Sequence, residues 1–227
     1  MRFIQDTMYD LLLLENQIPF LVLEDIFGCT ISKFDQTTSL YDIIHPILEL
    51  VSPLIMPNLK STFGSNTTPK HILGILHEHY RFAEDINLSP FGIPQLPTAV
   101  ELDKSGLNFE PFHYIESPLK MDVKSCRRPC FSCSWGKPTL RMPRLIIHEY
   151  TALILGNLIA YEQLSYDVAQ YFTSYIIAMD ALIQTEQDIE KLIESGVLVN
   201  YLGQNNEAAS LINNLGKELI TRGFFLL

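Results

Sequence analysis

The sequence lacks an apolar run long enough to cross a lipid bilayer. A spanning helix needs about 20 consecutive apolar residues, whereas the most apolar stretches here are interrupted by Glu24, Pro53 and Asn157. The first residues include an early Asp6 and no small-residue cleavage site, which argues against a signal peptide. We therefore expect this chain, taken alone, to be soluble.

Positive charge is also scarce. The 227 residues include 16 Lys and Arg against 26 Asp and Glu, a formal net charge of −10. This balance opposes binding to nucleic-acid phosphates and offers no polybasic membrane patch. The sequence also has no glycine-rich phosphate loop, serine elbow or paired histidine–glutamate metalloprotease signature. We expect no catalytic residue, no bound cofactor and no nucleic-acid partner.

Cysteine is rare, yet three of the four cysteines are close together, at Cys126, Cys130 and Cys133. Three thiolates at this spacing could hold an iron–sulfur cluster with one open iron site, or a structural zinc completed by His113 or His148. Metal analysis of the purified chain, together with the thermal stability of Cys130→Ser, separates these alternatives from a metal-free loop.

The surroundings of the three cysteines favour the metal-free interpretation. The cysteines lie between two strand-like runs, residues 119–123 and 140–147, which is the pattern of a β-hairpin with a long loop. Short cysteine motifs also arise often without a function. We therefore predict a small β-hairpin whose loop carries the cysteines, and we assign no metal-site residue.

A leucine-rich segment near the N-terminus, residues 10–27, contains a polar step and a proline inside an apolar run. Pro19 should break or kink the helix, and Glu15, Asn16 and Gln17 are placed to bind the backbone groups that it frees. The apolar residues recur at helical spacing, so we expect one broad face of two helical pieces to be buried; they are Leu11, Leu14, Ile18, Leu21 or Val22, and Leu23.

Polar residues occur in two further predicted helices. His71, His77 and His79 fall in residues 70–82, and we predict that they lie on the surface. Rings two residues apart on a helix point about 200° away from each other, so His77 and His79 should not share a metal. By contrast, Asn157, Glu162 and Gln163 lie among apolar neighbours, so we predict hydrogen-bonded buried groups that fix helix packing.

The whole pattern predicts a mainly α-helical fold, a multi-helix bundle with a small β-hairpin. The chain is long enough for a sizeable core, and we predict a single domain over residues 1–227. We divide it into a helical region at 1–86, a loop and short-strand region at 87–149, and a helical bundle at 150–223. Helices are expected at 38–51, 98–106, 151–164, 166–185, 189–194 and 207–220, with a strand after Gly106.

Four segments carry a resemblance to a known family; they are DLLLLENQIPF at 10–20, TAVELDKSGLNF at 98–109, NLIAYEQ at 157–163 and YIIAMDALI at 175–183. Together they resemble the plant-specific domain of unknown function 247 family over nearly the whole chain. The resemblance implies a longer flowering-plant protein, with a helical region before the first segment and a C-terminal hydrophobic helix that anchors it in a membrane, most simply the plasma membrane. We find neither part here and expect the chain to be truncated at both ends.

Two classes of function follow. The resemblance implies a non-catalytic recognition or signalling protein at a plant membrane, with a protein partner of unknown identity; some relatives act in the self-incompatibility of grasses. The alternative is a metal-binding module or enzyme that uses Cys126, Cys130 and Cys133. We favour the first class and predict that the chain is not an enzyme.

Overall fold

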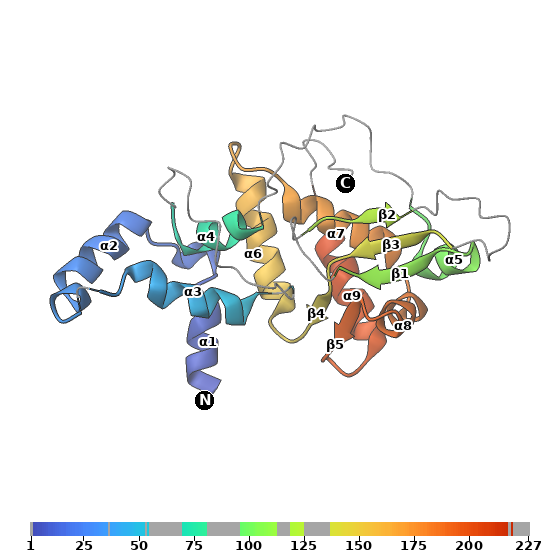
Figure 1. Ribbon diagram of the computed structural model, residues 1–227, viewed down its shortest axis with the longest axis horizontal. Coiled ribbons are helices and arrows are strands. Elements are labelled where there is room, and N and C mark those ends of the chain that lie inside the picture. The colour runs from blue at the N-terminus through green and yellow to red at the C-terminus, as the bar shows by residue number, and fades with distance from the viewer. Residues whose placement is uncertain are drawn as a thin grey trace, which may run out of the picture.

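The computed structural model describes residues 2–35, 37–52, 54, 70–80, 96–112, 119–124, 137–217 and 219, and the structural statements below concern these residues. Within them the fold is mainly α-helical with a few short strands, as the sequence predicts (Figure 1).

The N-terminal elements extend away from the rest of the molecule. After α1 (Arg2–Asp10) and the 3-10 turn η1 (Leu14–Asn16), the chain runs out through α2 (Phe20–Cys29) and η2 (Ile31–Lys33) and returns through α3 (Leu40–Val51) (Figure 1). We call residues 18–51 the arm.

Local sequence signals explain where the arm's helices begin. Pro19 stands immediately before α2, where its missing amide hydrogen leaves no helical hydrogen bond unmade. The predicted break at Pro19 is therefore confirmed. Ser39 and Asp42 form a reciprocal capping box that begins α3.

The remaining helices lie beside the arm and, with the sheets, form the body of the molecule (Figure 1). α4 (Ile72–His79) adjoins α6 (Thr151–Leu164), and α7 (Tyr171–Leu182), α8 (Glu186–Glu194) and α9 (Asn205–Gly216) follow α6 in the chain. The predicted bounds of α6 are confirmed. A short helix, α5 (Ala99–Lys104), ends before Gly106, whose φ of 93° suits glycine.

Two small sheets adjoin these helices. In the first, β1 (Asn108–Pro111) pairs in parallel with β3 (Thr139–Met142), and β2 (Asp122–Lys124) pairs with β3 antiparallel. The antiparallel pair is the predicted hairpin. In the second, β4 (Leu145–Ile147) pairs in parallel with β5 (Leu198–Asn200).

The second sheet corrects two expectations. The run at 140–147 is not one hairpin strand, because Pro143 lacks the amide hydrogen that a continuous ladder needs, and the chain changes partner between β3 and β4. β5 lies inside the region predicted to be only helical, because its three residues pair with a distant strand.

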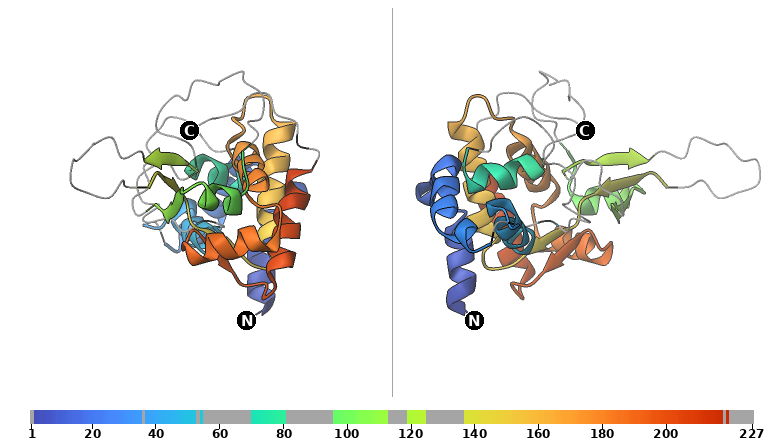
Figure 2. Two further views of the ribbon diagram at one scale, coloured as in Figure 1. Left: turned by 90° about the vertical axis from the view of Figure 1, so that its right-hand side faces the viewer. Right: turned by 60° about the vertical axis from the view of Figure 1, so that its left-hand side comes forward.

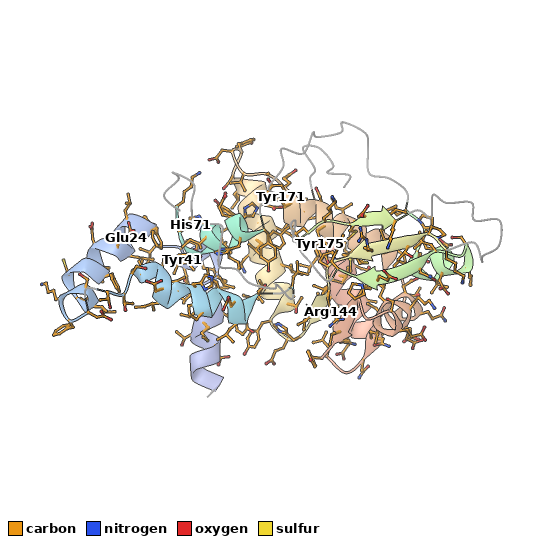
Figure 3. All side chains as sticks on the ribbon, viewed as in Figure 1. Glu24, Tyr41, His71, Arg144, Tyr171 and Tyr175 are labelled. Carbon is orange, nitrogen blue, oxygen red and sulfur yellow. The ribbon has the colours of Figure 1, made fainter. Side chains whose placement is uncertain are left out.

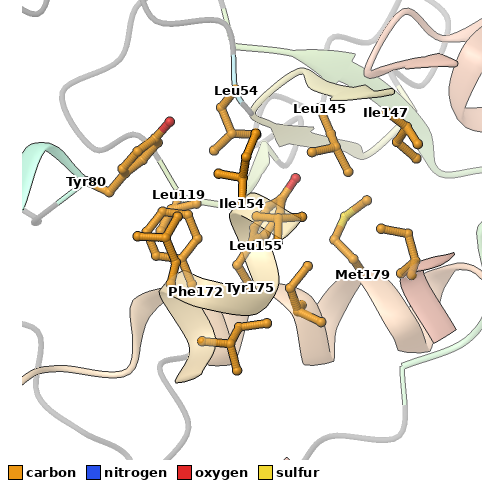
Figure 4. Packing of buried hydrophobic residues seen from close by; sticks show 14 of the residues in the cluster. Leu54, Tyr80, Leu119, Leu145, Ile147, Ile154, Leu155, Phe172, Tyr175 and Met179 are labelled. Carbon is orange, nitrogen blue, oxygen red and sulfur yellow. The ribbon is translucent and has the colours of Figure 1, made fainter. Parts of the chain in front are cut away.

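One continuous cluster of buried apolar side chains extends through the molecule, from Tyr9 and Leu48 to Phe172 and Ile212. Tyr80, Ile154, Phe172 and other members meet over α6 and α7 (Figure 4). The arm and the three-stranded sheet lie on opposite sides of α6 (Figures 1 and 2). The core thus sits around α6 and α7, and the arm projects from one side of it.

Candidate functional site: buried polar contacts around Glu162

Glu162 lies near the end of α6 and is fully buried, with 0% of its surface exposed. Its Oε1 atom accepts from Phe172 N at 2.8 Å and lies 2.8 Å from His77 Nε2. Its Oε2 atom accepts from Thr173 N at 2.8 Å and from Thr173 Oγ1 at 2.7 Å. A carboxylate offers about four acceptor positions, so the chain itself occupies all of them.

These bonds explain where α7 begins. Phe172 and Thr173 belong to its first turn, whose backbone amides have no partner within the helix. The Glu162 carboxylate binds both amides and places negative charge at the positive end of the helix dipole. The predicted start at residue 166 is therefore wrong, because the cap comes from another helix and not from the local sequence.

His77 is buried, which contradicts its predicted surface position. Its Nε2 atom lies within hydrogen-bond distance of Glu162 Oε1, so α4 and α6 are joined through the two buried side chains. Tyr171 stacks on the His77 ring at 5.7 Å between centroids, and Tyr161 meets it edge-on at 5.5 Å. Aromatic side chains and α6 thus cover a residue that the sequence pattern assigns to solvent.

His79 is also buried and faces the arm. Its Nδ1 donates to the Ile75 carbonyl at 2.7 Å, so the neutral ring can accept at Nε2 from the Tyr41 hydroxyl, 3.0 Å away. Burial, the main cause, lowers the pKa of His79. His77 and His79 therefore have separate partners, and their predicted exposure is wrong because α4 is covered on both sides.

The third histidine, His71, is half-buried. Its Nδ1 accepts from Gly74 N at 2.9 Å and so caps α4, and its ring meets Tyr161 edge-on. Burial lowers the pKa of His71, which favours the neutral form that this cap requires. Figure 3 labels His71 at the start of α4 and Tyr171 at the start of α7.

Hydrogen bonds of Gln17 and Asn157 join the leucine-rich segment to α4 and α6. Gln17 Nε2 donates to the carbonyls of Leu11 and Leu13 at 2.8 and 2.7 Å, and its Oε1 accepts from Leu73 N at 2.9 Å. Asn157 Oδ1 accepts from Leu14 N at 2.7 Å. The structural roles predicted for Gln17, Asn157 and Glu162 are confirmed.

Gln163 completes the predicted set, because its Nε2 donates to Thr173 Oγ1 at 3.3 Å. Asn16 binds the Asp10 carbonyl at 3.1 Å, as expected for the polar step, while Glu15 is exposed. The polar residues of the leucine-rich segment and of α6 therefore serve to join helices.

The proposed metal ligands Cys126, Cys130, Cys133 and His113 lie outside the described residues. His148 is described, and its Nδ1 accepts from Tyr150 N at 3.2 Å. Across the described ranges, no group of three or more His, Cys, Asp or Glu side chains is arranged to hold a metal ion. The same ranges contain no helix with the length and apolarity that crossing a membrane requires.

A surface hollow of about 470 Å³ lies between α6 and α9. Its lining is uncharged except for one carboxylate and comprises Ala152, Asn206, Glu207, Ser210, Leu211, Asn214 and Leu215. Ala152 and Glu162 are ten residues apart on α6, which is roughly 15 Å along a helix. The hollow therefore does not lead to the Glu162 contacts.

Exposed apolar side chains gather on the arm. Of the 14 large hydrophobic residues that are exposed among those described, eight lie between residues 18 and 50: Ile18, Leu21, Val22, Ile26, Ile31, Phe34, Ile43 and Leu50. The prediction that Ile18, Leu21 and Val22 contribute to a buried face is therefore wrong. α2 buries Phe20 against the body, and no described element covers its other side.

The family model described as plant protein of unknown function, DUF247, matches residues 1–225. The chain belongs to this family. The match includes the arm, α4, α6 and α7, so every contact of Glu162 lies within the region that defines DUF247.

Two proteins of Arabidopsis thaliana are similar to this DUF247 chain. UPF0481 protein At3g47200 is 25% identical over 236 residues, which cover 93% of this chain and 46% of that protein. Putative UPF0481 protein At3g02645 is 29% identical over 133 residues, which cover 58% of this chain and 23% of that protein. The match thus spans less than half the length of either relative. No solved structure matches the chain.

Proposed function

We propose that this DUF247 chain is the core of a non-catalytic recognition protein that binds another protein. The observation that carries the proposal is the concentration of exposed apolar side chains on the arm, where Leu21 is 62% and Phe34 is 93% exposed. Contiguous exposed apolar surface is characteristic of binding sites, because its removal from water on binding is favourable.

The Glu162 contacts support a scaffold role for the polar residues that are most suggestive of chemistry. A general acid or base needs free access to a substrate proton, but four groups of the chain already surround this carboxylate. Gln17 and Asn157 are likewise engaged with backbone groups. We therefore assign these residues to folding and not to catalysis.

The setting of this recognition is a proposal that comes from the family resemblance. We propose that a longer form of the protein is held at the plasma membrane by a C-terminal hydrophobic helix, and that it acts there in recognition or signalling. Self-incompatibility is one process in which such recognition would serve.

The test is to find and reconstitute a complex. Proteins that co-purify with the tagged chain from flowering-plant tissue are expressed separately and titrated against the purified chain by calorimetry. We expect at least one saturable complex of defined stoichiometry. If none of the purified candidates binds, the proposal is wrong.

A further inference from the structure

The outer face of α2 has the pattern of a helix-binding surface. Phe20 is buried, whereas Val22 and Ile26 are 44% and 55% exposed on the opposite side. Residues four apart occupy the same face of a helix, so Val22 and Ile26 form a stripe, and the exposed Ile18 precedes the helix. Leu21 borders the stripe at 62% exposure.

Asp25 borders this stripe, because it stands three residues after Val22, whereas Glu24, four residues after Phe20, lies on the other side of α2. Glu24 and Asp25 are exposed on α2, Glu15 precedes the helix, and Asp35 follows it. With Lys33 as the one basic residue, residues 15–35 carry four negative charges and one positive charge, a net of −3. Figure 3 shows Glu24 part-way along α2 on the arm.

The carboxylates on α2 are available to a partner. None of the ion pairs formed among the described residues involves Glu15, Glu24 or Asp25. An apolar stripe beside Asp25, in a segment of net negative charge, fits a ligand with apolar and positively charged groups on adjacent faces. A second copy of the chain, or an anionic membrane, would instead bring negative charge against negative charge.

We propose that the outer face of α2, formed by Leu21, Val22 and Ile26 and bordered by Asp25, binds a basic amphipathic helix of a separate protein. The proposal deepens the proposed function and rests on it, since it names the surface and the chemistry of the partner. Amphipathic helices bind such faces through anchors at i, i+3 or i+4, and i+7. Because α2 has ten residues, it is about 15 Å long and matches a partner helix of about three turns.

Designed peptides provide the first measurement. The probe is a helical peptide with a Leu and Ile stripe flanked by Lys and Arg, and two controls keep its composition with the stripe scrambled or replace its Lys and Arg by Glu. We expect saturable binding of the basic amphipathic peptide, weaker at high salt, and no binding of the controls. Equal binding of the acidic peptide would overturn the proposal.

Matched variants of the chain locate the site. Val22→Ser with Ile26→Ser removes the stripe, while Leu164→Ser with Tyr166→Ser removes two exposed apolar residues, 71% and 91% exposed, outside the arm. Since each change alters an exposed residue, both variants should keep the native circular dichroism spectrum. We expect the first pair to weaken peptide binding by about tenfold or more and the second to leave it unchanged; the reverse result contradicts the proposal.

Other occupants give distinct outcomes. A dimer of the native chain that the Val22 and Ile26 substitutions dissociate would identify a second copy as the occupant and overturn the proposal. Binding to phosphatidylserine vesicles that the same substitutions abolish would identify a membrane instead. If a reconstituted natural partner binds native chain and stripe variant equally, the α2 site is wrong but the proposed recognition function stands.

Discussion

α2 and α7 are similarly apolar in sequence, yet the protein uses them in opposite ways. Seven of the ten residues of α2 and nine of the twelve of α7 are apolar. Nine residues of α7 are buried, whereas only Phe20 is buried in α2. The difference comes from what surrounds each helix: α7 is capped by Glu162 and packed against α6 and α9, while α2 projects on the arm. Apolar content alone therefore does not determine burial.

The largest effect expected on the α7 side is that of Glu162→Ala. The substitution removes the acceptor of two backbone amides, a hydroxyl and a buried imidazole, and we expect it to lower the free energy of unfolding by about 3–5 kcal/mol. Urea unfolding followed by circular dichroism measures the change. Glu15→Ala, at an exposed carboxylate, is the control and should change stability by less than about 0.5 kcal/mol. Equal effects of the two would refute the role assigned to Glu162.

Ile176→Ala tests the packing of α7 directly. Ile176 is fully buried, at 0% exposure, so the substitution loses apolar burial and leaves a cavity. We expect a loss of about 2–5 kcal/mol, measured by the same unfolding experiment. A loss below about 1 kcal/mol would mean that the α7 surroundings collapse into the space, and that the contrast with the arm is smaller than the burial suggests.

Asn157→Ala tests the link between α6 and the leucine-rich segment. The Leu14 amide would lose its acceptor and the Leu153 carbonyl a donor, for an expected loss of about 1–3 kcal/mol. Asn206→Ala, at an exposed residue, is the matched control. An Asn157→Ala effect within the experimental error would show that water replaces the side chain at no cost.

The sequence predicts the local features well. The bounds of α6, the break at Pro19 and the stop before Gly106 depend on residues within one or two turns, and all are confirmed. Glu162 could be assigned as a buried polar residue because apolar neighbours surround it in a helical pattern; Asn157, predicted in the same way, makes the expected hydrogen bonds but is only half-buried.

What the sequence does not predict depends on distant partners. Glu162 caps α7 across ten residues and binds His77 across 85, so neither the start of α7 nor the burial of His77 has a local signal. The nearest sequence signal is the largely apolar run at residues 72–76, immediately before His77. The exposed stripe of α2 also depends on distant partners, because the spacing of Val22 and Ile26 places them on one face but does not show whether another element covers it.

Acidic pH should weaken the contact between the arm and the body. Burial is the main cause that lowers the pKa of His79. The hydrogen bond to the Ile75 carbonyl opposes it, His45 adds to the lowering, and Glu49 and Glu78 oppose it more weakly. Above the unfolded-state pKa of about 6.5, both states hold a neutral ring and stability is complete. Below it the unfolded state takes up the proton first, so stability decreases as the pH approaches the folded-state pKa.

The pH effect can be assigned by substitution. We expect the free energy of unfolding to fall between about pH 7.5 and about pH 5.5, and His79→Gln to reduce this slope. Part of the slope should remain, because burial also lowers the pKa of His71 and of His148. An unchanged slope in His79→Gln would show that His79 does not contribute.

The smallest effect is expected at Ile26, the arm's counterpart of Ile176. Ile26 is 55% exposed, so truncation to Ala removes little buried surface, and Ala has the higher helix propensity. We expect Ile26→Ala to change the free energy of unfolding by less than about 0.5 kcal/mol. A loss comparable with that of Ile176→Ala would mean that the outer face of α2 is covered within the isolated chain, which would remove the surface proposed for partner binding. If Ile26→Ala leaves the free energy of unfolding almost unchanged but abolishes peptide binding, Ile26 serves recognition, whereas Ile176 in α7 serves folding.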